Sequence, residues 1–299
     1  MNRHKIGLLF GFSAYILWGL FPLYWPLLEP ASAIEIVSHR AIWTFVFCVI
    51  ALALTNKLKA TFILIKDPKI FFRFFLTTSF LSVNWLVFIW ATHNDHLVES
   101  ALGYYITPLI MIAIGLLIFR EKMRKLQWLS VCIATIGVGV LTFDYGRLPW
   151  VALAIAISWG AYGGLKKHIN LGALEGLAIE TAIATPFYAL FLIWLTINGG
   201  GHFGSNIGLT SLLMAAGIIT AIPLLLFNGA AIRLSYTTIG LLQFITPTLI
   251  FLIGVLVRHE AMPTARWVGF LIIWLALIAL AVDLFKSSRA IDNGVAQGK

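Results

Sequence analysis

Long apolar stretches alternate with short polar segments along the whole chain. Within them the apolar residues run on continuously, and most stretches reach the roughly 20 residues that an α-helix needs to cross a bilayer. The pattern predicts an all-α membrane protein with ten transmembrane helices. Their predicted limits are 6–28, 34–54, 70–91, 98–119, 126–143, 149–165, 174–197, 209–231, 237–257 and 264–285.

Composition agrees with this membrane class. Of the 299 residues, 60% are hydrophobic and 11% are charged, whereas a soluble domain carries roughly 25% charged residues. The strands of a membrane β-barrel would appear as short segments of alternating apolar and polar residues. The apolar stretches here are long and continuous instead. The two cysteines, Cys48 and Cys132, lie in separate apolar stretches without a CxxC pair. We therefore expect neither a disulfide nor a zinc site.

The net charge of +9 indicates topology. Most of the 21 lysines and arginines fall in the predicted cytoplasmic segments, and the outer segments hold only Arg147, Arg258 and Arg266. Lys and Arg collect in cytoplasmic loops of membrane proteins. We therefore predict that both termini are cytoplasmic in the cell membrane. No basic region is combined with a nucleic-acid motif, so we predict no nucleic-acid partner.

Three segments outside the spans need an assignment. Ala31-Ser32-Ala33 resembles a signal cleavage site, but the stretch 6–28 before it is too long for a signal core, so we expect an uncleaved first helix. The segment 56–73 is either an interfacial helix or a plain cytoplasmic loop. The polar segment 286–299 is predicted to be a disordered cytoplasmic tail.

An internal duplication is the clearest sign of organisation. Ile106-Thr107-Pro108 recurs 139 residues later as Ile245-Thr246-Pro247, and Trp18-Gly19 recurs 141 residues later as Trp159-Gly160. The spacing of 139 also relates Gly115 to Gly254, Glu121 to Glu260, Trp128 to Trp267 and Asp144 to Asp283. Because each half has five helices, an odd number, the second half must enter the membrane inverted. We predict two inverted repeats, 1–144 and 145–285, which is a transporter architecture.

Several motifs resemble those of the EamA-type, ten-helix members of the drug/metabolite transporter superfamily, and among these most closely the RarD group. The motifs are Ser38-His39-Arg40 with Trp43, Asn84-Trp85 with Phe88-Ile89-Trp90-Ala91, Glu99-Ser100 with Leu102-Gly103-Tyr104-Tyr105 and Pro108, Ile179-Glu180-Thr181, Pro223, and Gln243-Phe244 with Pro247-Thr248-Leu249. The resemblance implies a permease of the cytoplasmic membrane with a central cavity lined by both halves. It implies no particular substrate.

Ionisable groups inside spans are candidates for function, because burying them in lipid is costly. Arg40 and His39 lie in the second span and are predicted to line the cavity; the alternative for Arg40 is that it snorkels to the outer surface. Glu180, in the seventh span, is the main candidate for carrying a proton, and Glu35 is the second. The alternative for Glu180 is a structural hydrogen bond to a neighbouring helix.

Aromatic and amide groups within spans suit stacking and hydrogen bonding to an organic solute. The predicted cavity residues of this kind are Asn84, Trp85, Tyr104, Tyr105, Asn228 and Gln243; the alternative for each is interface packing. Pro108 and Pro247 are predicted to kink helices at a gate, or to form static bends. His93, His96 and Glu99 lack a metal-ligand spacing, so we predict no metal site.

The predicted function is export of small organic metabolites or drugs by alternating access, with proton coupling through Glu180. The expected partners are a small organic solute and the lipid bilayer, the protein being a monomer or weak dimer, with no cofactor. A membrane-embedded enzyme is the first alternative, but the chain has no HExxH, GxSxG or phosphate-loop motif. A lipid flippase or scramblase without solute transport is the other.

Overall fold

The computed structural model is helical in the part of the chain that it describes. It describes residues 3–117, 125–144, 146–166, 169, 171–231, 233 and 242–297, and no β-strand occurs among them. The helices are α1 (Arg3–Tyr24), η1 (Trp25–Leu28), α2 (Ala33–Leu54), α3 (Leu58–Ile63), η2 (Leu64–Lys66), α4 (Pro68–His93), α5 (Leu97–Leu117), α6 (Lys125–Asp144), α7 (Trp150–Lys166), α8 (Ala173–Ile197), α9 (Ile207–Ala231), α11 (Ile245–Leu252), η3 (Ile253–Val257) and α12 (Thr264–Gln297).

Five of the described helices are long enough to span a membrane. By length and composition these five can cross a membrane: Lys5–Leu28, Ala33–Leu54, Pro68–His93, Ala173–Ile197 and Ile207–Phe227. Shorter apolar helices occur at Trp128–Asp144, Ile245–Val257 and Thr264–Ala279. The predicted all-α, multi-pass membrane class is therefore confirmed. The tenfold count stays a prediction, because residues 234–241 of the ninth predicted span lie outside the described part.

Local sequence explains where several helices begin and end. The Ser32 side chain accepts a hydrogen bond from the Glu35 backbone N–H and caps α2. Asp67 caps α4 in the same way, ahead of Pro68 at the first helical position. Asn56 ends α2 with a φ of 56°, in the left-handed region that Asn tolerates. These signals place the helix ends within a few residues of most predicted span limits.

The end of the chain differs from its prediction. Residues 286–299 were expected to form a disordered tail, but the helical backbone of α12 continues to Gln297. The segment contains no proline and Gly294 is its sole glycine before residue 298, so nothing in it stops a helix that is already formed.

The kink and loop predictions meet different outcomes. α5 runs through Pro108, whose side chain lies outside the described part. Pro247 is the third residue of α11, where a proline costs no helical hydrogen bond; its part in a gate stays a prediction. Between the second and third spans, α3 and η2 form a short helical segment.

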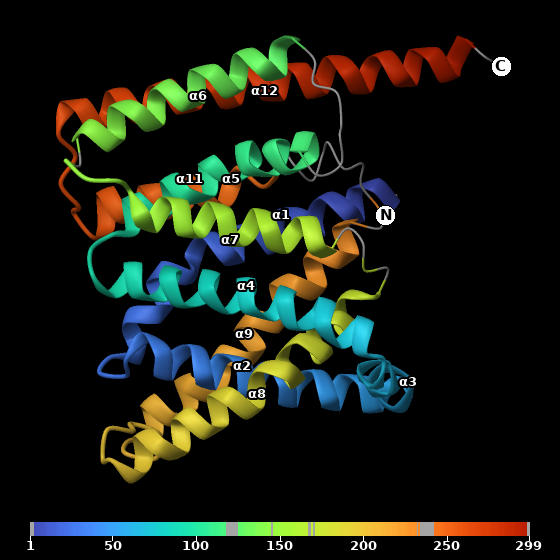
Figure 1. Ribbon diagram of the computed structural model, residues 1–299, viewed down its shortest axis with the longest axis vertical. Helices are drawn as coiled ribbons and strands as arrows, with labels where there is room; N and C mark the ends of the chain where they lie inside the picture. Colours follow the sequence, from blue (N-terminus) through green and yellow to red (C-terminus); the bar gives the residue numbers. More distant parts are fainter. Residues whose placement is uncertain are drawn as a thin grey trace.

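The helices are stacked in pairs along the longest axis of the molecule (Figure 1). α6 packs on α12, α5 on α11, and α2 on α8. The remaining major contacts come in matching couples: α5 with α7 and α11 with α1, α4 with α7 and α9 with α1, α2 with α9 and α8 with α4. The start of α1 and the end of α12 lie at the same end of the bundle.

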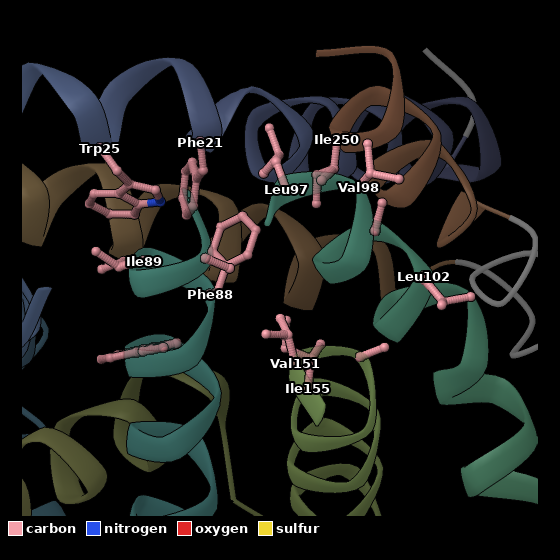
Figure 2. Close-up of a cluster of buried hydrophobic side chains, with 14 of the residues drawn as sticks. Phe21, Trp25, Phe88, Ile89, Leu97, Val98, Leu102, Val151, Ile155 and Ile250 are labelled. Atoms are coloured by element: carbon pink, nitrogen blue, oxygen red, sulfur yellow. The ribbon is translucent and has the colours of Figure 1, made fainter. Parts of the chain in front are cut away.

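The core lies where α1, α4, α5, α7 and α11 meet. Figure 2 shows Phe21 of α1 and Trp25 of η1 beside Phe88 and Ile89 of α4, with Ile155 of α7 beyond them. Close helix approaches support this packing. A Cβ added at Gly217 of α9 would lie 2.4 Å from the Trp43 carbonyl carbon of α2, so only glycine allows these two backbones to come this near.

Candidate functional site

Arg40 lies inside the helix bundle within a cage of aromatic rings. Its side chain is only 4% exposed. The guanidinium carbon lies 3.9 Å from the centroid of the Trp85 ring, 5.0 Å from that of Trp25 and 5.6 Å from that of Phe21. Cation–π attraction of this kind stabilises a cation removed from water. This burial contradicts the alternative that Arg40 snorkels to the outer surface; that Arg40 lines a cavity stays a prediction.

The charge of Arg40 has no anionic partner in the described part of the chain. Its Nε donates a 2.7 Å hydrogen bond to the Thr220 hydroxyl of α9, whose own proton is donated to the Ala216 carbonyl. The described carboxylates that form ion pairs do so with other cations. A guanidinium has five N–H donors. This cation thus retains both positive charge and donors for an anionic group.

A chain of hydrogen-bonded polar side chains lies beside the cage. Tyr104 of α5 donates a 3.2 Å hydrogen bond to Asn84 Oδ1 of α4, and Asn84 Nδ2 donates to the Ser158 hydroxyl of α7 at 3.1 Å. Tyr104 and Tyr188 of α8 are close enough to influence Arg40 electrostatically. The residues around Arg40 therefore come from both predicted halves, on α1, η1, α2, α4, α5, α7, α8 and α9.

Other predicted cavity residues lie elsewhere. Tyr105 points away from its neighbour Tyr104, and its hydroxyl shares a 2.8 Å hydrogen bond with Thr248 of α11. Gln243 is half-buried in the turn before α11. The side chain of Asn228 lies outside the described part. The structure therefore brings together Arg40, Trp85, Asn84 and Tyr104, but not Tyr105.

The first residues of α2 are held by the loop before α9. A Glu35 carboxylate oxygen lies 2.8 Å from His202 Nδ1, and the other accepts a 2.7 Å hydrogen bond from the His202 backbone N–H. The His39 ring stacks on Phe203 at 4.8 Å, and Trp43 extends this stack. Glu35 and His39, the predicted secondary proton carrier and cavity residue, are thus engaged with a loop and not with the Arg40 cage.

Glu180 has its own set of partners, separate from those of Arg40. Its carboxylate is 1% exposed and lies 3.0 Å from Lys166 Nζ. Tyr162 donates a 3.3 Å hydrogen bond to the other carboxylate oxygen, and the Glu180 backbone carbonyl accepts one from Thr78 of α4. The Glu180 carboxylate is therefore engaged with both Lys166 and Tyr162 in this structure.

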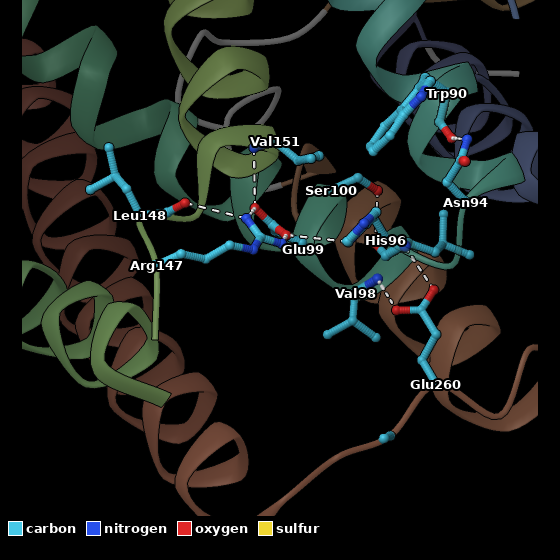
Figure 3. A network of polar contacts seen from close by, with 12 residues as sticks. Trp90, Asn94, His96, Val98, Glu99, Ser100, Arg147, Leu148, Val151 and Glu260 are labelled. Atoms are coloured by element: carbon cyan, nitrogen blue, oxygen red, sulfur yellow. Dashed lines mark hydrogen bonds and ion pairs between the residues drawn. The ribbon is translucent and has the colours of Figure 1, made fainter. Parts of the chain in front are cut away.

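A network of charges ties the helix ends on the predicted outer side (Figure 3). Glu99 of α5 pairs with Arg147 at 2.8 Å and accepts a hydrogen bond from Val151 N at the start of α7. Glu260, in the loop before α12, accepts hydrogen bonds from the Leu97 and Val98 N–H groups that begin α5. Each half thus supplies a carboxylate that caps a helix of the other half.

The same network lines a cavity of about 210 Å³, formed by Asp95, His96, Glu99, Arg147, Glu260 and Arg266. Burial raises the pKa of Glu260 above its usual range, against the lowering effect of its two backbone hydrogen bonds. The described residues contain no cluster of three His, Cys, Asp or Glu that could hold a metal ion. His93 instead makes a 2.9 Å hydrogen bond with the Trp25 carbonyl.

Sequence reasoning missed several partners that complete these sites. They are Phe21, Trp25, Ser158, Tyr162, Lys166 and Thr220. Lys166 directly follows the predicted sixth span, 149–165, which predicts a cytoplasmic loop cation. The spacing of 141 that relates Trp18 to Trp159 also relates Phe21 to Tyr162 and Trp25 to Lys166, and this extension of the repeat was the available signal.

Known proteins are similar in sequence to this chain over nearly its full length. The model of the EamA-like transporter family matches residues 5–143. Protein RarD of Streptomyces exfoliatus is 43% identical over 289 residues, covering 96% of this chain and 92% of that protein. The chain belongs to the EamA family of drug/metabolite transporters, with RarD-like members as relatives. The motifs around Arg40 and Glu180 therefore belong to a membrane transporter.

Other relatives agree with this assignment. The uncharacterized transporter YojE of Bacillus subtilis is 40% identical, covering 96% of this chain and 97% of that protein. Protein RarD of Escherichia coli is 38% identical, covering 96% and 98%. One crystal structure, with 17% sequence identity, superposes with a TM-score of 0.63 over 94% of this chain and 99% of that one. This last likeness supports the fold alone.

Proposed function

We propose that the protein is an alternating-access permease for small organic solutes that carry an anionic group, with Arg40 as the anion-binding residue. The observation that carries the proposal is a buried, caged cation without a described carboxylate partner, at a point surrounded by helices from both halves. A bidentate guanidinium suits a carboxylate, and the Trp85 and Trp25 rings suit an aromatic or amphipathic body beside it.

Alternating access follows from the proposed inverted repeat of 1–144 and 145–285. The packing supports it. Exchanging α1 with α7, α2 with α8, α4 with α9, α5 with α11 and α6 with α12 converts each major helix contact either into another major contact or into itself. The family model also spans 5–143, about one predicted half. Two nearly equivalent packings of such halves open to opposite sides of the membrane. We place both termini in the cytoplasm, which agrees with the start of α1 and the end of α12 lying at the same end of the bundle.

Export and proton coupling through Glu180 are the finer parts of the proposal. Glu180 is buried and paired with Lys166, so opening this pair would be the step at which a proton binds. A membrane-embedded enzyme finds less support, because relatives are named transporters. A lipid flippase remains the second candidate, but the enclosed position of Arg40 favours a solute smaller than a phospholipid.

The test is uptake by proteoliposomes of hippurate, an aromatic monocarboxylate that is ionised at neutral pH, against its neutral amide. We expect the purified protein to transport hippurate above the level of protein-free liposomes and to transport the amide at least tenfold more slowly. Equal rates for acid and amide would contradict anion selectivity. Lipid scrambling without flux of either solute would instead favour the flippase.

A further inference from the structure

The repeat relates the Arg40 cage to the surroundings of Glu180 position by position. At a spacing of 141, Phe21 corresponds to Tyr162 and Trp25 to Lys166. Arg40 and Glu180 each lie seven residues after the first residue of their helices, which begin at Ala33 and Ala173. At 1.5 Å per residue both charges are about 10 Å from the start of α2 or α8.

The contacts correspond as well as the positions. Arg40 lies over the rings of Phe21 and Trp25, and Glu180 contacts Tyr162 and Lys166, the residues related to these two. The same positions on paired helices thus form two charged sites. In the first half the cation comes from α2, and in the second half it comes from α7.

The two sites lie toward opposite ends of the bundle. Lys57, just after α2, forms a 2.8 Å ion pair with Glu175 in the first turn of α8. The end of α2 is therefore close to the start of α8, and the two helices run in opposite directions. Arg40, near the start of α2, is correspondingly remote from the end of the bundle where Lys166 and Glu180 lie.

Lys166, like Arg40, lies over aromatic rings, but unlike Arg40 it has a carboxylate partner among the described residues. Its ammonium lies 5.3 Å from the Phe74 ring centroid and 5.6 Å from that of Tyr162. A Cβ at Gly176, one turn before Glu180, would lie 2.8 Å from this nitrogen, so glycine leaves room for it. Lys166 is 28% exposed and within reach of water, and its carboxylate partner is supplied by Glu180 of the same chain.

We propose that Lys166 is a second anion-binding station, at the opposite end of the transport path from Arg40, and that Glu180 occupies it as a tethered substitute for the solute carboxylate. An incoming carboxylate replaces Glu180 over the Phe74 and Tyr162 rings. A tethered carboxylate is a strong competitor because its effective concentration is high. This inference rests on the proposed function, since it assigns the same solute a second site.

The test is calorimetric titration of the full-length protein in detergent with hippurate, at fixed pH and salt. We expect E180Q to bind hippurate at least tenfold more tightly than the wild type, because the competing carboxylate is gone. E180D, which keeps the charge but shortens the side chain, should give a smaller gain and provides a second variant if E180Q does not fold. The neutral amide of hippurate should show no gain.

The control is K166M in the E180Q background. Loss of the gain in this double variant supports the station, whereas a gain that persists without Lys166, or E180Q and E180D binding no more tightly than the wild type, overturns it. R40M separates the two proposals. A Lys166-dependent gain that survives R40M, together with unchanged hippurate uptake by R40M, would uphold the station and contradict the role proposed for Arg40.

Discussion

Glu99 offers a test of how the outer charge network holds the two halves together. Its carboxylate is 1% exposed, pairs with Arg147 at 2.8 Å, and caps α7 through Val151 N at 3.1 Å. E99Q removes the charge and keeps a single acceptor oxygen. A charge-assisted hydrogen bond contributes about 1.5–3 kcal/mol and a helix cap about 1 kcal/mol. Since Arg147 is 39% exposed and can be hydrated, we expect a net loss of about 2 kcal/mol.

The matched control is D95N, which alters a carboxylate of the same network. Asp95 is 76% exposed and lies 3.7 Å from Arg258, an arrangement that contributes at most about 1 kcal/mol. Its φ of 55° is one that Asn also adopts, so the backbone is not strained by the change.

The assay is thermal unfolding of the purified proteins in one detergent at one pH. At roughly 2–4 °C for each kcal/mol in a chain of this order of size, E99Q should lower Tm by about 4–8 °C and D95N by at most about 2–4 °C. Equal shifts for the two variants would refute the reasoning that burial and helix capping make Glu99 the stronger link.

Three further predictions concern a close helix contact, a buried carboxyl group and the topology. G217A, whose Cβ would lie 2.4 Å from the Trp43 carbonyl carbon, should lower Tm by several degrees, at about 1–3 kcal/mol for overpacking, whereas G139A, which meets no atom within 4 Å, should not lower it. Burial raises the pKa of Glu260, so the contribution of this carboxyl to stability is largest at low pH and declines as pH rises through the folded-state pKa. The Tm of E260Q minus that of the wild type should therefore rise from pH 5 to pH 8. A Tm difference that falls over this range would contradict the sign of the argument. Reporter fusions at the C-terminus should indicate the cytoplasm, and a periplasmic signal would overturn the proposed topology.

Hydropathy was sufficient to locate the helices because spanning a bilayer imposes a length of apolar residues. The structure begins α2 at Ala33 and α8 at Ala173, next to the predicted limits at 34 and 174. The tail was less predictable, since polar composition argues against burial but does not by itself stop a helix that is already formed. Pro247 likewise has no fixed meaning in sequence alone, because a proline is favourable in the first turn and disruptive in the interior.

The site was predictable in kind but not in its contacts. Arg40 and Glu180 stand out because ionisable groups inside apolar stretches are costly. Tyr104 and Tyr105, however, are chemically alike and adjacent, and their helical positions differ by about 100°; only the packing shows that Tyr104 joins Asn84 while Tyr105 joins Thr248. Lys166 seemed a loop cation, because its pairing with Glu180 depends on how α7 crosses α8.

The central claim is that Arg40 binds the anionic group of a transported solute. Its most direct test is hippurate uptake by proteoliposomes that contain R40M, R40K or the wild-type protein at equal amounts. Met keeps most of the apolar contact with the Trp85 ring and removes the charge, and Lys keeps the charge without the guanidinium fork. The account predicts that R40M loses hippurate uptake at least tenfold while R40K retains part of it. Wild-type uptake by R40M, in a folded protein of unchanged Tm, would contradict the account.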